Sequence, residues 1–435
     1  MAELDVRRPA VAQAQPAVDA DTLIRSVLFV AAFLATWISF HPFQSLAEPP
    51  QAVKEGGDLV NQIAFSSLFL TLAGWTWLHQ PQRLLFVVRP VFIVLLAWMA
   101  LTCLTSWEPA LAMRRFAFAV VLLGIGMMVP LLPKNIRHFS DLIAAVALIT
   151  LVGCYLGVLF VPQLAVHQAT DFLEPEHAGE WRGVFAHKNQ AGAVMVMIIF
   201  IGLFVARMRS LALGGAITAL AAIFLGFSQS KTAIAVMPLV FVLSTIITHS
   251  RRPAFGIGLV VAILFAFNLF SVGTVIFEPV HRLVAMVMPD ASFTGRTDIW
   301  ELGVHAVAQR PITGYGFSSF FGTDQVVYGL GENTSWANAA TDAHNAYLNL
   351  ALTIGLPGLI LTIIWIVVLP IADFYRLPTE PVAAPLQLLF LRICLYGIYS
   401  SCFESSIFQQ VGEVWFFFMI SAFGLRYASV MRTRA

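Results

Sequence analysis

Charged residues are scarce in this sequence of 435 residues, of which Asp, Glu, Lys and Arg make up only 11%. Soluble domains carry about 25% charged residues, so the composition argues against a water-soluble fold. The formal net charge of +1 gives no electrostatic reason to expect a nucleic-acid partner. Hydrophobic residues account for 59% of the chain, and the mean hydropathy is +0.81. These values predict an integral membrane protein.

Cysteine is also rare. The four cysteines, Cys103, Cys154, Cys394 and Cys402, lie in apolar runs and form no C-x-x-C pair. We interpret them as lipid-facing or core-facing fillers rather than as disulfide partners or metal ligands. The sequence has no H-E-x-x-H motif, no G-x-S-x-G motif and no recognisable metal-ligand cluster. We therefore expect neither a metal site nor a cofactor.

Long apolar runs fill most of the chain. A helix that crosses a bilayer needs about 20 mostly apolar residues, because no water is present to satisfy its backbone groups. Windows of that length predict an all-α, polytopic protein with about twelve transmembrane helices. The predicted segments are 26–42, 59–78, 87–106, 114–132, 141–161, 189–206, 211–228, 231–248, 254–277, 346–371, 386–402 and 409–427. The seventh and eighth meet at Gln229-Ser230, and a tight helical hairpin there would change the count by about two.

Lys and Arg in the short connections predict the orientation, because cytoplasmic loops carry an excess of both. If the N-terminus is cytoplasmic, most basic residues fall on the inner side or at the inner ends of the helices. They are Arg7, Arg8, Arg25, Arg83, Arg89, Lys134, Arg137, Arg207, Arg209, Arg251, Arg252, Arg376, Arg426, Arg432 and Arg434. Both termini are therefore predicted to be cytoplasmic. Ser45-Leu46-Ala47 has the form of a signal-peptidase site, but the preface of about 25 residues is long for a signal peptide, so we expect a retained helix.

The chain divides into a tail and one membrane domain. Residues 1–22 are rich in Ala, Pro, Gln and Asp and are predicted to form a disordered cytoplasmic tail, with a single transmembrane domain over 23–435. Two connections on the outer side, 162–188 and 278–345, are long, and loops above about 15 residues usually have a function. The second is predicted to contain a short helix, Thr297 to Gln309. An active surface away from the cytoplasm disfavours ATP or nucleotide-sugar donors.

The first group of candidate functional residues lies at the start of the predicted sixth helix. Arg182, His187 and Lys188 place a guanidinium, an imidazole and an ammonium within a few residues of each other. Arginine offers donors in a fixed fork that suits phosphate oxygens. The alternative interpretation is an interfacial anchor whose charged ends reach the lipid headgroups.

Two further groups lie in or next to the second long connection. Arg296 precedes a predicted helix, where its charge would add to an anion site made by free backbone N–H groups; the alternative is an ordinary helix cap with a solvated arginine. His344 enters the tenth segment and is able to take a proton near neutral pH, although a lone histidine there is also compatible with a structural role. Asn345 faces a different side of that helix. Lys231 and Glu404 are ionisable groups near predicted outer helix ends.

In this order and on this membrane frame, these groups resemble the O-antigen ligase and polysaccharide polymerase superfamily (Wzy/WaaL-like), and most closely its ExoQ-like exopolysaccharide polymerases. The matching strings are Arg182-Gly183-Val184-Phe185-Ala186-His187-Lys188-Asn189, Ser228-Gln229-Ser230-Lys231-Thr232, Gly295-Arg296 with Trp300, Pro311 through Gly316, and His344-Asn345 followed by Gly355 and Gly358. The likeness covers most of the chain and is strongest between about 180 and 360. Lys231 departs from the pattern, because many relatives carry Arg there.

The resemblance implies a GT-C-type glycosyltransferase of the bacterial inner membrane. It implies transfer of a glycan from an undecaprenyl-diphosphate donor to a glycan acceptor, with inversion and without a metal. Arg182 and Arg296 would bind the donor diphosphate, and His344 would act at the acceptor hydroxyl. His187, Lys188, Lys231 and Asn345 are further candidates for substrate binding. Membrane lipid and other polysaccharide-export proteins are the partners that the resemblance suggests.

Several interpretations of function stay open at this point. A ligase that moves a finished glycan onto lipid A core or protein would use the same chemistry with another acceptor. A transporter of lipid-linked glycans belongs to another class, and it would place polar residues and broken helices near the bilayer midplane. A scaffold of an export complex is a third possibility. The polymerase is the interpretation that we favour.

Overall fold

The computed structural model describes residues 19–48, 58–172, 174–250, 252–287, 293, 295–329, 340–377 and 380–431. Over these residues the regular structure is helical, apart from one isolated antiparallel bridge between Val166 and Trp181. The predicted all-α class is therefore confirmed. Residues 1–18 of the predicted tail lie outside the described residues. The first helix begins at Ala20, where the Asp19 side chain accepts a hydrogen bond from the backbone of Thr22.

Nine helical stretches within the described residues are long and apolar enough to cross a membrane. They are α1 (Ala20–Trp37), α2 (Leu59–His79), α5 with η1 (Pro109–Leu131), α6 (Ile136–Phe160), α8 (Lys188–Met208), α9 (Leu211–Ser228), α10 (Lys231–His249), α11 (Pro253–Phe270) and the run from α15 to α16 (Ala346–Tyr375). Two shorter apolar helices, α4 (Pro90–Leu104) and α17 (Ala384–Ser400), and α18 (Glu413–Met431) accompany them. Each predicted segment overlaps one of these helices. The chain is thus a multi-pass membrane protein, and the total of about twelve spans stays a prediction.

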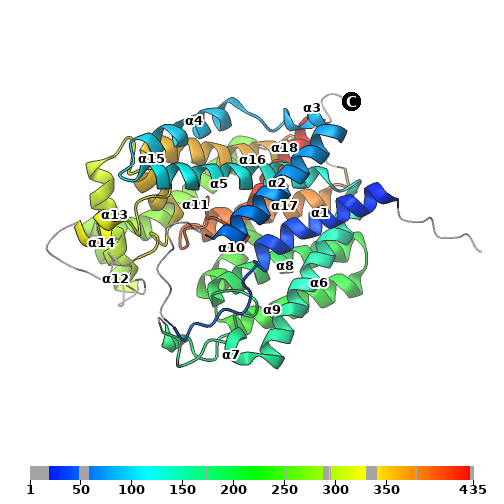
Figure 1. The fold of residues 1–435 in the computed structure, drawn as a ribbon, viewed down its shortest axis with the longest axis horizontal. Coiled ribbons are helices and arrows are strands. Elements are labelled where there is room, and N and C mark those ends of the chain that lie inside the picture. The colour runs from blue at the N-terminus through cyan, green and yellow to red at the C-terminus, as the bar shows by residue number, and fades with distance from the viewer. Residues whose placement is uncertain are drawn as a thin grey trace, which may run out of the picture.

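The long helices form one bundle, and three short helices of the second long connection gather at one end of it (Figure 1). There α12 (Glu278–Val287), α13 (Arg296–Gln309) and α14 (Asp324–Gly329) lie at the left of the view, whereas α3 (Pro81–Leu84) and the start of α1 lie toward the right. The central helix is α8, whose side chains are mostly buried. Because α8 begins at Lys188, the first long connection leads directly into this mostly buried helix.

Basic residues that the sequence assigns to the cytoplasmic side meet at one carboxylate. The buried side chain of Asp373 in α16 (Leu369–Tyr375) forms ion pairs with Arg89, Arg376 and Arg426. These arginines come from the start of α4, the end of α16 and from α18. The three chain segments therefore lie on the same side of the bundle, as the sequence predicts.

The second long connection carries its own apolar core. Trp300 and Ile299 of α13 pack with Tyr315 and Phe320, and the cluster extends to Leu352 of α15. The helix predicted from Thr297 to Gln309 is confirmed as α13, which begins one residue earlier. A second core of this kind packs the described part of the connection against the first half of α15.

The predicted segment 346–371 is not one continuous helix, and this is a correction to the sequence analysis. The backbone of Gly355 is non-helical, with φ 68° and ψ 176°, and a π-helix follows at Ile364–Val368. The backbone N–H groups of Tyr315 and Gly316 donate to the carbonyls of Leu352 and Thr353, at 2.8 and 3.0 Å. The turn from Pro311 to Gly316 therefore supplies the partners that a break in a helix leaves free.

Candidate functional site

The site is built around the N-terminus of α15, and Asn345 fixes its position. The Asn345 side chain caps the helix by accepting a hydrogen bond from the Leu348 backbone at 2.9 Å. Its amide group donates to the Cys402 carbonyl at 2.9 Å and to the Asn268 side chain at 3.0 Å. Asn345 thus ties α15 to α11 and to the connection between α17 and α18. These contacts are structural, and the substrate-binding role expected for Asn345 stays a prediction.

His344 is held immediately before this cap. The indole N–H of the buried Trp300 donates to the Ala343 carbonyl at 3.0 Å, and the His344 backbone N–H donates to the Asp342 carboxylate at 2.7 Å. His344 adopts a left-handed backbone conformation, with φ 46°. Its Nδ1 lies 3.8 Å from Asp342 and 3.6 Å from Glu404. Two carboxylates therefore face the same ring nitrogen.

Glu404 joins three of the chain segments that the site requires. Arg296, the first residue of α13, donates from its guanidinium to the Glu404 carboxylate at 3.2 Å and to the Phe403 carbonyl at 2.6 Å. The side-chain amide of Asn189 in α8 also donates to Glu404, at 3.2 Å. Because His344 contacts the other oxygen of the same carboxylate, the structure brings Arg296 and His344 together.

The charges in this cluster shift one another's pKa values. Burial by itself raises the pKa of Glu404, but the His344 side chain and the charge of Arg296 outweigh burial and lower it. Burial alone would lower the pKa of His344, and the neighbouring carboxylates of Glu404 and Asp342 instead raise it above the usual histidine value. The cluster therefore favours an ionised glutamate and a histidine that holds its proton more tightly than usual.

Lys231 is an exposed cation whose chain neighbour Ser230 contacts this cluster. It is the first residue of α10, next to Ser230, whose hydroxyl donates to Asn189 at 3.3 Å. Asn189 in turn contacts Glu404. Among the residues that the structure describes, no hydrogen bond or ion pair to the Lys231 side chain is formed.

The hydrogen bonds of the Arg182 guanidinium go to backbone carbonyls and not to the Arg296–His344 cluster. Arg182 is almost fully buried, with 1% of its surface exposed. Its guanidinium donates to the carbonyls of Phe185, Ala186 and Gln44. This arrangement holds the backbone just before α8 and does not support the direct contact with a diphosphate expected for Arg182. Burial also lowers the pKa of the guanidinium.

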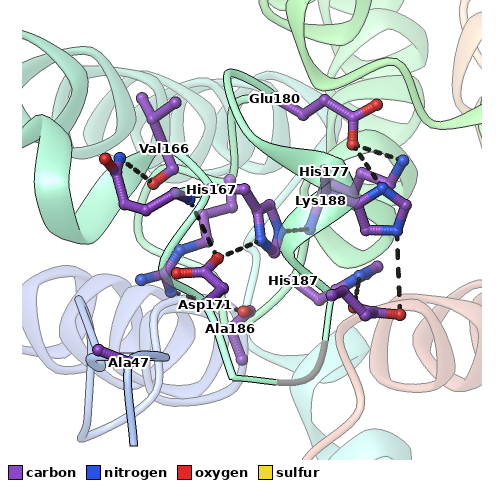
Figure 2. Close-up of polar contacts among 12 residues, drawn as sticks. Ala47, Val166, His167, Asp171, His177, Glu180, Ala186, His187 and Lys188 are labelled. Atoms are coloured by element: carbon purple, nitrogen blue, oxygen red, sulfur yellow. Dashed lines mark hydrogen bonds and ion pairs between the residues drawn. The ribbon is translucent and has the colours of Figure 1, made fainter.

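His187 and Lys188 belong to a polar cluster in the first long connection (Figure 2). His187 lies 2.7 Å from the Glu174 carboxylate, and the buried Lys188 ammonium lies 2.6 Å from Glu180. Hydrogen bonding to His187 lowers the pKa of Glu174 to about 2. Both expected substrate-binding residues are thus paired with carboxylates of their own loop.

Sequence reasoning did not assign Glu404 or Asn189 to the site. Glu404 is an ionisable residue at the end of an apolar segment, and this signal is visible in the sequence. Asn189 is the last residue of the string that begins at Arg182. Neither feature reveals the contact between them, because α8 and the α17–α18 connection are far apart in the chain.

Two comparisons with known proteins bear on this arrangement. Residues 216–363 match the family model described as O-antigen ligase. The exopolysaccharide production protein ExoQ of Rhizobium meliloti (strain 1021) is 28% identical over 214 residues, which cover 46% of this chain and 48% of that protein. The predicted resemblance to the O-antigen ligase superfamily is confirmed. The chain spans about half the length of the curated relative that it matches.

The O-antigen ligase match covers only one part of the site. It includes Lys231, Arg296 and His344, together with the break at Gly355. Glu404, which contacts both Arg296 and His344, lies beyond its end. The structure therefore adds the α17–α18 connection to the part of the chain that resembles the O-antigen ligases.

Proposed function

We propose that this protein polymerises undecaprenyl-diphosphate-linked oligosaccharide repeat units into exopolysaccharide by an inverting, GT-C-type glycosyl transfer. The observation that supports this function best is the cluster of Arg296, Glu404 and His344. The exposed Lys231 follows Ser230, which contacts Asn189 of this cluster. A cation and a titratable base lie at the membrane entry of apolar helices. This combination suits a lipid-linked, anionic donor.

Arg296 and Lys231 would stabilise the leaving group. When the bond between the anomeric carbon and the phosphate oxygen breaks, undecaprenyl diphosphate leaves with added negative charge. Fixed cations near that oxygen stabilise the transition state. A guanidinium has five N–H donors, and Arg296 directs only part of them to Phe403 and Glu404.

His344 would accept the proton of the attacking hydroxyl. Its Nδ1 faces Glu404 and Asp342, which favours a proton on Nδ1 and leaves Nε2 to act as the base. The acceptor oxygen then bonds to the anomeric carbon from the face opposite the diphosphate, and its proton moves to Nε2. A positioned base contributes about 10²–10⁴-fold in rate. Arg182 supports the site indirectly by holding the backbone before α8.

Two alternatives are weighed against this function. The O-antigen ligase description of the matching family favours a ligase as the second candidate, in which lipid A core or another acceptor replaces the growing glycan. A transporter is supported less well, because the broken helix α15 has its free carbonyls bound by Tyr315 and Gly316. In transporters such groups coordinate the substrate or ion.

The proposal includes a location. The charge distribution in the connections supports cytoplasmic termini, with the Arg296–His344 cluster on the periplasmic face of a bacterial inner membrane. Lipid-linked glycan donor, glycan acceptor and membrane lipid are the proposed partners, and other polysaccharide-export proteins would receive the product.

A reconstitution experiment tests the function. Purified protein in liposomes is given an undecaprenyl-diphosphate-linked repeat unit without nucleotide, and the glycan is analysed on a gel. We expect a ladder of longer lipid-linked products that is lost in His344→Ala and Arg296→Ala and kept in His305→Ala, a change at an exposed histidine of α13. Transfer only to added lipid A core would indicate the ligase. Movement of donor between leaflets without any product would contradict the enzyme.

A further inference from the structure

The first long connection brings together three residues that are able to bind a metal ion. Glu174, His177 and His187 each offer one ligand atom, and these atoms lie within 4.8 Å of one another. Glu174 directly precedes the short turn η2 (Pro175–His177), His177 is its last residue, and His187 precedes α8. Figure 2 shows the side chains of His177 and His187 near one another in this polar cluster. A spacing of this size suits ligands around one cation.

The His177 ring is already oriented for such a role. Its Nδ1 lies 3.1 Å from the Glu180 carboxylate, and the same oxygen lies 2.6 Å from the Lys188 ammonium. A carboxylate on one ring nitrogen fixes the tautomer and presents the other nitrogen as a ligand, which is the usual support of a metal-bound histidine. The Nε2 atom of His177 lies 3.9 Å from Glu174, so it faces the proposed site.

His187 and Glu174 form the other side of the site. The Nε2 atom of His187 lies 2.7 Å from the Glu174 carboxylate, and its Nδ1 accepts a hydrogen bond from the Asn189 backbone at 3.1 Å. When a metal binds Nε2, the ring proton moves to Nδ1, and the capping hydrogen bond from the Asn189 backbone is lost. The ion would displace the His187–Glu174 hydrogen bond and bridge the same two groups.

The surrounding loop is held in place independently of these ligands. His167 is buried between Asp171, 2.9 Å from its Nδ1, and the Lys188 backbone N–H, 3.3 Å from its Nε2. Its ring lies 5.1 Å from that of His187 and 5.8 Å from that of His177. Both of its nitrogens are engaged, so it packs against the site without being a ligand. The contacts of His167 hold the backbone beside the ligands and do not change when the ion binds.

We propose that Glu174, His177 and His187 bind one Zn²⁺ ion, which fastens the first long connection to the start of α8. Two imidazoles and one carboxylate are ligands that Zn²⁺ accepts with a water in the fourth position. Mg²⁺ and Ca²⁺ prefer oxygen ligands throughout. The three side chains are partly exposed, at 23 to 44%, which leaves access for the ion and the water. This site was not expected from the sequence, and the glycosyl transfer has no step through it.

Metal binding is measurable without any glycan substrate, so the result is independent of the proposed enzyme activity. Protein purified on a tag without histidine is treated with chelator, titrated with Zn²⁺ by calorimetry, and its bound metal is counted by mass spectrometry. We expect one Zn²⁺ per chain. We expect binding to be lost in His177→Ala and Glu174→Gln, weakened about 10–100-fold in Glu180→Gln, and unchanged in His305→Ala.

A second variant separates ligand loss from misfolding. In His177→Cys a thiolate replaces an imidazole, and the Co²⁺-loaded protein should gain a sulfur-to-cobalt charge-transfer absorption that the wild type lacks. Folded wild-type protein that retains no zinc after titration would overturn the proposal. Zinc that is retained equally in His177→Ala, or a cobalt spectrum that His177→Cys leaves unchanged, would also overturn it.

Discussion

Among single side chains, Glu404 has the most connections within the site. It accepts hydrogen bonds from Arg296 and Asn189 and faces the ring of His344. A carboxylate in this position both orients the two groups and sets the proton affinity of the histidine. Its removal should therefore change how the reaction depends on pH, in addition to its rate.

The first prediction concerns this pH dependence. A general base works only when it is unprotonated, and the pKa of His344 is raised by Glu404 and Asp342 against the effect of burial. Activity should thus rise with pH through a midpoint above the usual histidine value of about 6.5. In Glu404→Gln the midpoint should move to lower pH, because a neutral amide stabilises the imidazolium less. Initial rates of product formation between pH 5 and 9 measure this, and an unchanged midpoint would contradict the role of Glu404.

Arg296 gives the second prediction. Loss of one charged donor at a developing anion commonly reduces turnover by about 10²–10³-fold, so Arg296→Ala should fall in this range. Arg296→Lys should recover little, because an ammonium lacks the planar fork. Turnover and KM are measured with the lipid-linked donor. Arg282→Ala is the control, since Arg282 lies on the exposed face of α12; equal losses in both variants would exclude a specific role for Arg296.

Among the structural elements, α15 departs most from a regular helix. Its break at Gly355 is bound by the turn from Pro311 to Gly316, and a Cβ atom at Gly355 would lie only 1.8 Å from the Ile312 carbonyl oxygen. The positive φ and this close approach together require glycine. The junction of the second connection with the membrane helix thus depends on a residue that has no side chain.

The third prediction follows from this junction. Gly355→Ala should lower stability by more than the about 1–3 kcal/mol of backbone strain, because the added methyl group also displaces the turn. Thermal unfolding in detergent, followed by intrinsic fluorescence, measures the change. Gly258→Ala in α11 is the control, since a Cβ there has no neighbour within 4 Å. A melting temperature equal to that of the control would show that the turn is not tightly docked.

Most elements could be predicted because a long apolar run leaves a membrane chain few alternatives to a helix. The same signal hides the break in α15, since hydropathy does not register backbone conformation. Arg182 shows that residue type alone does not predict a side chain's contacts. An arginine at this position suggests phosphate binding, but its three carbonyl partners are visible only in the folded chain. Arg296 and His344 were found from their residue types and strings, whereas their common partner Glu404 required the packing of distant helices.

For the molecule as a whole, Asp373 holds together the end of the bundle that lies opposite the Arg296–His344 cluster. Three arginines from separate segments surround this buried carboxylate. Loss of one partner of a buried ion pair leaves uncompensated charge and costs about 3–5 kcal/mol. Such a loss would weaken the association of α4, α16 and α18, which lies away from the Arg296–His344 cluster.

The fourth prediction separates stability from activity on this basis. Asp373→Asn should lower the melting temperature strongly, while the turnover of the protein that remains folded should be close to wild type. Asp141→Asn is the matched control, because Asp141 pairs with Arg209 on the surface, where such pairs contribute about 0–1 kcal/mol. A large loss of turnover in folded Asp373→Asn would show coupling between the two ends of the bundle.

The docking of the turn at Gly355 also bears on the order in which the chain is made. Residues 311–316 leave the ribosome before α15, so the backbone groups that complete the break already exist when that helix is inserted. The helix is able to enter the bilayer as an ordinary span of apolar residues and to acquire its irregular shape afterward, when the turn reaches it. Membrane insertion and completion of the site would then be separate events in biogenesis, with the final form of α15 acquired only in the second.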